Sequence, residues 1–207
     1  MVEKKIILIG GGGHCRSCID VIERGQEFTI AGIVEQPGKK NSESLLGYPI
    51  IGVDHELDAL KKTYDYALVT LGQVGSSTVR QRLFNRLKQA GFILPAVISC
   101  LAYVSKHAQI GEGTIVMHQV MVNANARVGK NCILNTRCLV EHDVRIGDHT
   151  HVSTGAVLNG EVRIGSGSFV GSNGTIVQGV KLPDNWFLKA GRLIASEKDG
   201  HPMKEGQ

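Results

Sequence analysis

One periodicity constrains the fold of this 207-residue chain more than any other feature. From Ile98 to Ile194, every sixth residue is isoleucine, valine or leucine, without a break. Glycines that each follow an aliphatic residue recur at a spacing of eighteen: Gly111, Gly129, Gly147 and Gly165. Three hexads make one turn of a three-sided coil, and hexapeptide repeats are typical of a parallel β-helix, whose coils bury their aliphatic residues by stacking.

The hexads also predict which side chains point into the prism. The residue two positions before each aliphatic residue is often small or apolar, as a narrow interior requires: Ala96, Ala102, Ala108, Ala126, Cys132, Cys138, Ala156 and Ser168. Side chains alternate between the two faces of a strand, so the remaining positions point outward or lie at corners. We therefore expect Asn135, His142 and His151 to lie outside the prism.

The first half of the chain alternates between strand and helix patterns. Strands are expected at Lys5–Ile9, Thr29–Val34 and Tyr66–Thr70. Tyr48–Ile51 is interpreted as a turn or a short edge strand, because Pro49 cannot donate a hydrogen bond to a central ladder.

Three helices are expected between these strands. The first follows the four glycines 10–13 and carries one apolar face, formed by Cys15, Cys18, Ile19 and Ile22. The second begins at Asp54, and the third is capped by Ser76 or Ser77 and ends at Gly91. Alternation of this kind predicts a parallel sheet with helices on its faces, which is a Rossmann-like α/β domain. The predicted domains are residues 1–95 (Rossmann-like), 96–195 (β-helix) and 196–207, a weakly ordered polar tail.

Composition excludes several classes of function. The net charge is +4 without a dense basic block, and aromatic residues make up 5%, so a nucleic-acid-binding surface is not expected. No apolar run is long enough to span a membrane, and the start of the chain does not resemble a signal peptide, so a cytoplasmic protein is expected. The mild positive balance suits anionic small molecules such as nucleotides and coenzyme A. The chain has five cysteines, and a disulfide framework is not expected. Cys15 and Cys18 are expected to be packing residues, and no metal site is expected.

The polar run from Asn135 to Asp143 is the best candidate for chemistry. It places His142 between Glu141 and Asp143. A neutral imidazole is a natural general base near neutral pH, and a neighbouring carboxylate raises its basicity. The residues alone also allow a simpler interpretation, in which these three side chains form a solvated corner.

These motifs together resemble one branch of the hexapeptide-repeat acyltransferases, the sialic acid O-acetyltransferases and the bacillosamine-type amino-sugar N-acetyltransferases. The resemblance rests on the hexads, on Asn135-Thr136, Glu141-His142-Asp143, His151–Gly155 and Asn159-Gly160, and on Ile7–His14. It implies a left-handed β-helix, acetyl-CoA as co-substrate, a nucleotide-linked amino sugar as acceptor, and a homotrimer with its active site between adjacent prisms.

The resemblance also implies roles for single residues. His142 matches the catalytic histidine, and Asp143 matches an acidic residue that raises its basicity. Asn135 matches a position near the acceptor sugar, and the positions that match acetyl-CoA contacts are His151, Ser172 and Ala190. The residues that match the nucleotide-sugar site are Gly12, Gly13, His14, Glu35, Gln36 and Gly72.

Physical reasoning supports the placement of the nucleotide sugar. A glycine-rich turn before a helix exposes backbone N–H groups to anions, and ligands of parallel sheets bind at the carboxyl ends of strands. A dinucleotide is not expected, because Cys15 occupies the third glycine position of the fingerprint.

The expected activity is acetyl-CoA-dependent N-acetylation of a nucleotide-linked amino sugar, such as a 4-amino-4,6-dideoxy hexose, in bacterial surface glycan biosynthesis. Two alternatives remain open at this point. One is O-acetylation of a sialic-acid-like sugar, and the other is a non-catalytic scaffold that binds a nucleotide sugar.

Overall fold

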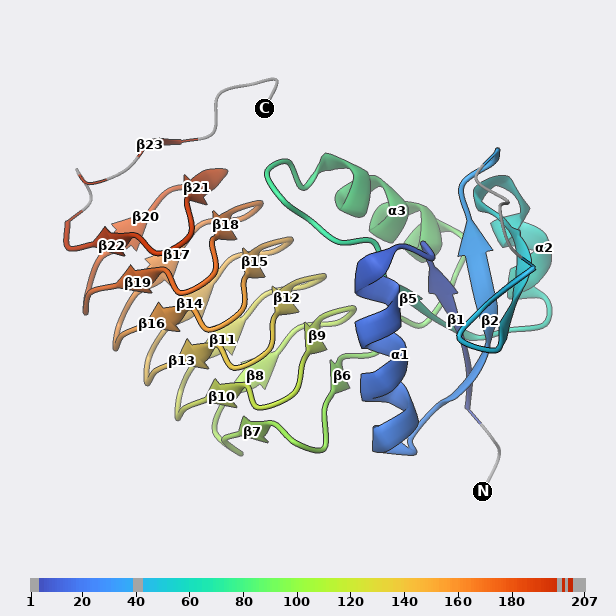
Figure 1. Ribbon diagram of the computed structural model, residues 1–207, viewed down its shortest axis with the longest axis horizontal. Helices are drawn as coiled ribbons and strands as arrows, with labels where there is room; N and C mark the ends of the chain where they lie inside the picture. The colour runs from blue at the N-terminus through green and yellow to red at the C-terminus, as the bar shows by residue number, and fades with distance from the viewer. Residues whose placement is uncertain (1–3, 39–42, 197–198, 200, 203–207) are drawn as a thin grey trace. The chain divides into compact units, whose positions relative to one another are not determined.

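The computed structural model describes residues 4–38, 43–196, 199 and 201–202, and it divides the chain into two compact units (Figure 1). The first unit comprises residues 1–72 and 80–95, and the second comprises residues 73–79 and 96–207. The short segment 73–79 therefore folds with the second unit, although the first unit continues on both sides of it in the sequence.

The first unit is built on a five-stranded sheet. Its strand order is β3 (Ser44–Leu45), β4 (Tyr48–Val53), β2 (Thr29–Glu35), β1 (Lys5–Ile9) and β5 (Tyr66–Val69). All neighbouring pairs are parallel except β3 and β4. After β1 the chain moves outward to β2 and β4, and it then returns to the opposite side of β1 as β5. The strand order thus reverses between β1 and β5, as the predicted Rossmann-like class requires.

The helices of this unit cover the sheet on both faces. They are α1 (Gly13–Gly25), the 3₁₀ turn Asp54–Glu56, α2 (Leu57–Lys61) and α3 (Thr78–Gln89). Ile7 and Ile9 of β1 share one buried cluster with residues of α2 and α3, namely Leu57, Leu83, Phe84 and Leu87. Strand alternation turns the buried Ile6 and Leu8 to the opposite face. Because parallel crossovers are right-handed, the outward step from β1 to β2 puts α1 on that opposite face.

The interpretation of Tyr48–Ile51 as a turn or edge strand is wrong. Strand β4 runs from Tyr48 to Val53 and lies between β3 and β2. Pro49 is tolerated because it is the second residue of the strand, beside the tight turn to β3, and the neighbouring amide of Ile50 donates to the Glu43 carbonyl instead, at 2.9 Å.

The second unit is a three-sided parallel β-helix, of the left-handed class (Figure 1). The first wall consists of β6 (Val97–Ile98), β9 (Ile115–Val116), β12 (Ile133–Leu134), β15 (His151–Val152), β18 (Phe169–Val170) and β21 (Trp186–Leu188). The second wall consists of β7 (Tyr103–Val104), β10 (Met121–Val122), β13 (Leu139–Val140), β16 (Val157–Leu158), β19 (Thr175–Ile176) and β22 (Leu193–Ile194). The third wall consists of β8 (Gln109–Ile110), β11 (Arg127–Val128), β14 (Arg145–Ile146), β17 (Arg163–Ile164) and β20 (Lys181–Leu182).

The hexad aliphatic residues form the core of the prism, as predicted. Each strand pairs in parallel with the strand eighteen residues away, for example Val122 with Val140. Every hexad aliphatic residue from Val116 to Ile194 is buried, whereas Ile98, on the first coil at the end of the stack, is 42% exposed. The interior is therefore the continuous aliphatic column that the six-residue period indicates.

The three walls present different outward columns. The first wall carries apolar and aromatic residues that are buried up to Phe169: Val97, Ile115, Ile133, His151 and Phe169. The second wall carries a mainly apolar column with exposed members: Tyr103, Met121, Leu139, Val157, Thr175 and Leu193. The third wall carries a polar and cationic column: Gln109, Arg127, Arg145, Arg163 and Lys181.

The polar tail contains a strand that its sequence does not predict. Strand β23 (His201–Pro202) pairs antiparallel with β21, through Pro202 opposite Trp186 and His201 opposite Phe187. Residues 197–198, 200 and 203–207 of the predicted tail lie outside the described residues.

Cys15 and Cys18 have the expected packing role. Cys15, Cys18, Cys132 and Cys138 are buried, and Cys100 is exposed. Burial raises the pKa of the Cys15 thiol to about 11 and also raises that of Cys18, which disfavours the thiolate that redox chemistry needs.

Candidate active site

The corners of the coil set the position of the candidate base. At every corner from Gly113 to Gly191, the residue three positions after the inward aliphatic residue adopts a positive φ. Asp143 occupies one such position, with φ 62°. Aspartate tolerates this left-handed conformation better than most residues. The conformation is thus the ordinary corner of the repeat, and it holds His142 and Asp143 side by side where β13 ends and β14 is about to begin.

His142 and Asp143 form the hydrogen-bonded pair that the sequence suggests. The distance from His142 Nδ1 to Asp143 Oδ2 is 2.9 Å. An ionised carboxylate only accepts, so Nδ1 carries the hydrogen and Nε2 keeps its lone pair. The imidazole side chain is 52% exposed, which confirms that it lies outside the prism. This orientation leaves Nε2 available to remove a proton from a bound molecule.

The carboxylate also changes the acid–base balance of the pair. The hydrogen bond that His142 Nδ1 donates to Asp143 raises the pKa of His142, and the nearby charges of Asp143, Glu141 and Glu161 act in the same direction. In return, His142 and the Asn125 amide lower the pKa of Asp143. The Asn125 amide donates to Asp143 Oδ1 at 2.5 Å, so the carboxylate is held from both sides. The pair is a stronger base than an isolated histidine.

Replacing Asp143 with asparagine is expected to move the acid limb of the pH–rate profile to lower pH. The reactive form is the neutral imidazole, so activity falls as the pH drops through the pKa of His142. Asp143 raises that pKa, so its loss lowers it toward about 6.5, while the plateau rate falls because the tautomer is no longer fixed. Steady-state kcat/KM measured across pH 5–9 tests this. An unchanged acid limb contradicts the role of Asp143.

Gly160 lies directly against the imidazole. A Cβ atom at this position would come within 2.7 Å of both His142 Cε1 and Nε2. The residue stands eighteen positions after His142, so it occupies the same corner of the next coil. The absence of a side chain at Gly160 therefore allows the imidazole to lie against the neighbouring coil.

Replacing Gly160 with alanine is expected to displace the His142 ring and to lower kcat by about 10- to 100-fold, because a misplacement of about 1 Å can cost this much. The melting temperature should change little, because the clash falls on the half-exposed His142 side chain and not on the buried core. Gly25→Ala is the matched control, since a Cβ at Gly25 meets nothing within 4 Å. Equal kcat for wild type and the Gly160 variant would remove the positioning role.

The other β-helix residues predicted for the site lie on a different edge of the prism. Asn135, Ser172 and Ala190 all lie at the corner between the first and second walls. The Ser172 hydroxyl is 3.0 Å from that of Ser153, and the Ser172 carbonyl accepts from Gly191 N at 2.8 Å. Ala190 is exposed. His142 lies at the corner between the second and third walls.

His151 is buried outside the prism rather than exposed. Only 6% of the residue is accessible, and its ring packs edge-on against Phe169. Its Nδ1 is 2.6 Å from the Gln73 carbonyl, and its Nε2 is 3.1 Å from Asn135 Nδ2. A carbonyl only accepts, so Nδ1 is the donor and Nε2 accepts from the Asn135 amide. The segment 73–79 thereby covers His151, and His151 orients Asn135.

One chain therefore does not bring all these predicted residues together. Asn135 and His142 are separated by the width of the second wall, on the order of 15 Å for a coil side at about 3.3 Å per residue. A sugar ring whose amine lies at His142 is smaller than this distance, so it would not contact Asn135 of the same chain. The two edges border the same wall, which is the one with the exposed apolar column.

The predicted nucleotide-sugar residues lie together in the first unit. Gly12 precedes α1 as its N-cap and provides no side-chain cap, and Cβ atoms at Gly12 and Gly13 would meet nothing within 4 Å. His14, in the first turn of α1, packs against Gly72, which follows β5. These residues surround the point where the strand order reverses, and the open amides at the helix start favour an anion there.

Glu35 has a structural task at this same end of the sheet. Its Oε1 accepts from Gly11 N at 2.7 Å, and its Oε2 accepts from Gln36 N at 3.2 Å. A Cβ at Gly11 would collide with Oε1, so a larger residue here would displace the Glu35 carboxylate. Gln36 is exposed beside it. Glu35 thus stabilises the glycine turn through this hydrogen bond. The sequence did not predict this role of Glu35.

Sequence reasoning missed Asn125 and Gly160 as neighbours of the His142–Asp143 pair. A signal for both was present, because Asn125 lies eighteen residues before Asp143 and Gly160 lies eighteen residues after His142. In a coil of three hexads, this spacing brings residues into direct contact. Within the described ranges, no group of three or more potential metal ligands and no helix long and apolar enough to cross a bilayer is present.

Comparison with known proteins gives consistent matches. Residues 5–87 match the PglD N-terminal domain family. A UDP-N-acetylbacillosamine N-acetyltransferase of Bacillus subtilis is 30% identical over 114 residues, which cover 55% of this chain and 51% of that protein. The chain thus matches about half the length of this curated relative.

Two solved structures match almost the whole chain. PerB of Caulobacter crescentus, in complex with CoA and GDP-perosamine, is 30% identical with a TM-score of 0.85, covering 93% of this chain and 89% of that one. The acetyltransferase domain of PglB of Neisseria gonorrhoeae, in complex with acetyl coenzyme A, is 29% identical with a TM-score of 0.84, covering 94% and 92%. Two further structures are variants of the Caulobacter enzyme in which one histidine is replaced by asparagine or alanine.

Proposed function

The chain belongs to the bacillosamine-type amino-sugar N-acetyltransferase branch of the hexapeptide-repeat acyltransferases, and we propose that it transfers the acetyl group of acetyl-CoA to the amine of a nucleotide-linked amino sugar. A 4-amino-4,6-dideoxy hexose destined for a bacterial surface glycan is the proposed acceptor class. We place the reaction in the cytoplasm.

The observation that carries the proposal is the His142–Asp143 pair. Nε2 of His142 would take the proton of the attacking amine, while Asp143 stabilises the imidazolium that forms. The amine nitrogen then bonds to the thioester carbonyl carbon, and the thiolate of coenzyme A leaves when the tetrahedral intermediate collapses. The proton held by His142 can return to that leaving sulfur. The glycine turn before α1 would hold the phosphates of the acceptor.

The working enzyme is proposed to be a homotrimer. The second wall exposes Tyr103, Met121 and Leu193, of which Tyr103 is 57% accessible, and an exposed apolar column of this kind marks an interaction surface. The two candidate edges border that wall. A cyclic trimer uses different faces of each chain at one interface, so it would bring the His142 edge of one chain to the Asn135 edge of its neighbour.

The direct test supplies the purified protein with acetyl-CoA and a panel of UDP-, GDP- and dTDP-linked amino sugars. Release of free thiol and a mass increase of one acetyl group on one acceptor are expected. An alkali-stable product identifies an amide, whereas a product cleaved by alkali is an ester and contradicts N-acetylation. Absence of transfer to every acceptor, together with no rise in melting temperature on adding acetyl-CoA, contradicts the proposal.

A further inference from the structure

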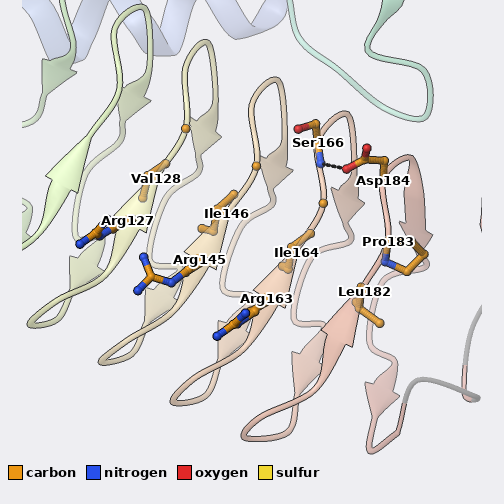
Figure 2. A pocket seen from close by; sticks show the side chains of 13 residues that line it. Arg127, Val128, Arg145, Ile146, Arg163, Ile164, Ser166, Leu182, Pro183 and Asp184 are labelled. Atoms are coloured by element: carbon orange, nitrogen blue, oxygen red, sulfur yellow. Dashed lines mark hydrogen bonds between the residues drawn. The ribbon is translucent and has the colours of Figure 1, made fainter.

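The third wall carries a column of cations that the proposed chemistry does not use. Arg127 pairs with Arg145, Arg145 with Arg163, and Arg163 with Lys181, each in direct register on adjacent parallel strands. We call these four residues the cation ladder. Figure 2 shows its three arginines on successive coils, with their side chains extending to the same side of the wall. Adjacent strands lie about 4.8 Å apart, so the four charges are close neighbours.

The ladder is not neutralised by the chain itself. Within the ranges that the structure describes, none of the four cations forms an ion pair with a carboxylate. Three carboxylates lie beside the ladder, and each already accepts a hydrogen bond from another group. His142 and Asn125 donate to Asp143, the Gln178 amide donates to Glu161, and Ser166 N donates to Asp184. Like charges in direct register on adjacent strands destabilise a sheet. Four cations in succession therefore do not stabilise the fold. Binding of an anion to them explains their position better.

Two hollows run along the ladder. The first is lined by Arg127, Arg145 and Arg163 together with Gly129, Gly147 and Gly165, so side chains of cations border a strip without side chains (Figure 2). The second is lined by Asp143, Glu161, Gly179, Arg145, Arg163 and Lys181. Arg145 and Arg163 line both hollows, and the second hollow reaches Asp143, the partner of His142.

From this geometry we propose that the cation ladder, centred on Arg145 and Arg163, binds the phosphate groups of a substrate whose reactive end lies at His142. This inference rests on the proposed function and adds a binding site to it. The guanidinium fork matches phosphate oxygens with two parallel hydrogen bonds, and a ladder of such forks suits a diphosphate ester. Both coenzyme A and a nucleotide sugar contain one, and a nucleotide sugar bound here would have its diphosphate at the ladder instead of at the glycine turn before α1.

The test measures binding rather than turnover. The double variant Arg145→Gln/Arg163→Gln is titrated calorimetrically with coenzyme A, UDP, GDP and inorganic diphosphate. Loss of two charge-assisted contacts is expected to lower the affinity for at least one of these probes by about 10- to 100-fold. The melting temperature without a ligand should stay equal or rise, because two like charges are removed from adjacent strands.

Two control variants make the result specific. Arg24→Gln/Lys106→Gln removes the same net charge from exposed residues of α1 and of the first coil, and it should leave every dissociation constant near wild type. Arg145→Lys/Arg163→Lys keeps the charge and loses the fork, so it should bind with intermediate affinity.

The probes distinguish the two sources of phosphate. If the double variant binds coenzyme A more weakly than the wild type does, but binds UDP and GDP with unchanged affinity, the ladder belongs to the acetyl-donor site. If only UDP or GDP binds more weakly, the ladder belongs to the acceptor site. If wild type and Arg145→Gln/Arg163→Gln bind all four probes with equal affinity, the ladder is not a phosphate-binding site. The proposal of acetyl transfer is not affected by that result. If the double variant binds diphosphate more weakly than the wild type, but the wild type transfers acetyl to no acceptor, only the proposed function is contradicted.

Discussion

Replacement of His142 by alanine is expected to lower kcat by about 10²- to 10⁴-fold, the usual contribution of a positioned general base. The amine of an amino sugar must lose a proton as it attacks the thioester, and Nε2 of His142 is the atom that the Asp143 hydrogen bond leaves free to accept it. The KM for acetyl-CoA should change much less than kcat, because the imidazole acts on the transferring proton. Initial rates of thiol release give both constants.

The loss of activity is not expected to result from impaired folding. The His142 side chain is half-exposed at a corner, and the prism core beneath it consists of aliphatic residues that do not depend on it. The variant should therefore keep the melting temperature and the oligomeric state of the wild type. His107→Ala, at an exposed histidine of the first coil, is the matched control and should retain full activity. Wild-type turnover by the His142 variant would remove this residue from the mechanism.

Two inactive variants are expected to restore activity when they share a trimer. His142→Ala retains an intact Asn135 edge, and Asn135→Ala retains an intact His142 edge. In a cyclic trimer containing both variants, one of the three interfaces joins the two intact edges. Mixed trimers selected through two different affinity tags should therefore show about one third of the wild-type kcat per trimer. This gain is large, because each variant alone is expected to be nearly inactive.

The complementation experiment separates two architectures that single substitutions cannot distinguish. If each chain carries a complete site, mixed trimers only show the sum of the two residual activities, and the shared cleft is refuted. A tagged mixture of wild type and His142→Ala serves as the control, and it should lose activity in proportion to the His142 edges removed. Sedimentation of the same samples establishes that they are trimers.

Local sequence patterns were sufficient for most of the fold. The six-residue period gave the β-helix, its walls and its core, because every coil repeats the same inward aliphatic residue and stacks on its neighbours. The alternation of strands and helices gave the Rossmann-like unit for a similar reason. The expectation for Tyr48–Ile51 was wrong because Pro49 was taken to exclude a central strand. Pro49 lies beside the turn to the two-residue strand β3, where a proline is tolerated.

The candidate site was only partly predictable. The pairing of His142 with Asp143 is a contact between neighbours in sequence, so it could be inferred directly. The contacts of Asn125 and Gly160 with this pair depend on stacking at a distance of eighteen residues, which the repeat contained but the reasoning did not use. The cation ladder follows the same spacing and becomes a surface only when coils stack in register.

By itself, the sequence determined the three-sided prism, its buried aliphatic column and a histidine outside it beside a carboxylate, because repetition fixes the environment of every hexad position. Only the tertiary structure decided that residues 73–79 cover His151, that His151 orients Asn135, and that Asn135 and His142 lie on different edges of one wall. The contact between Gln73 and His151 joins residues 78 positions apart, and no local period encodes such a contact.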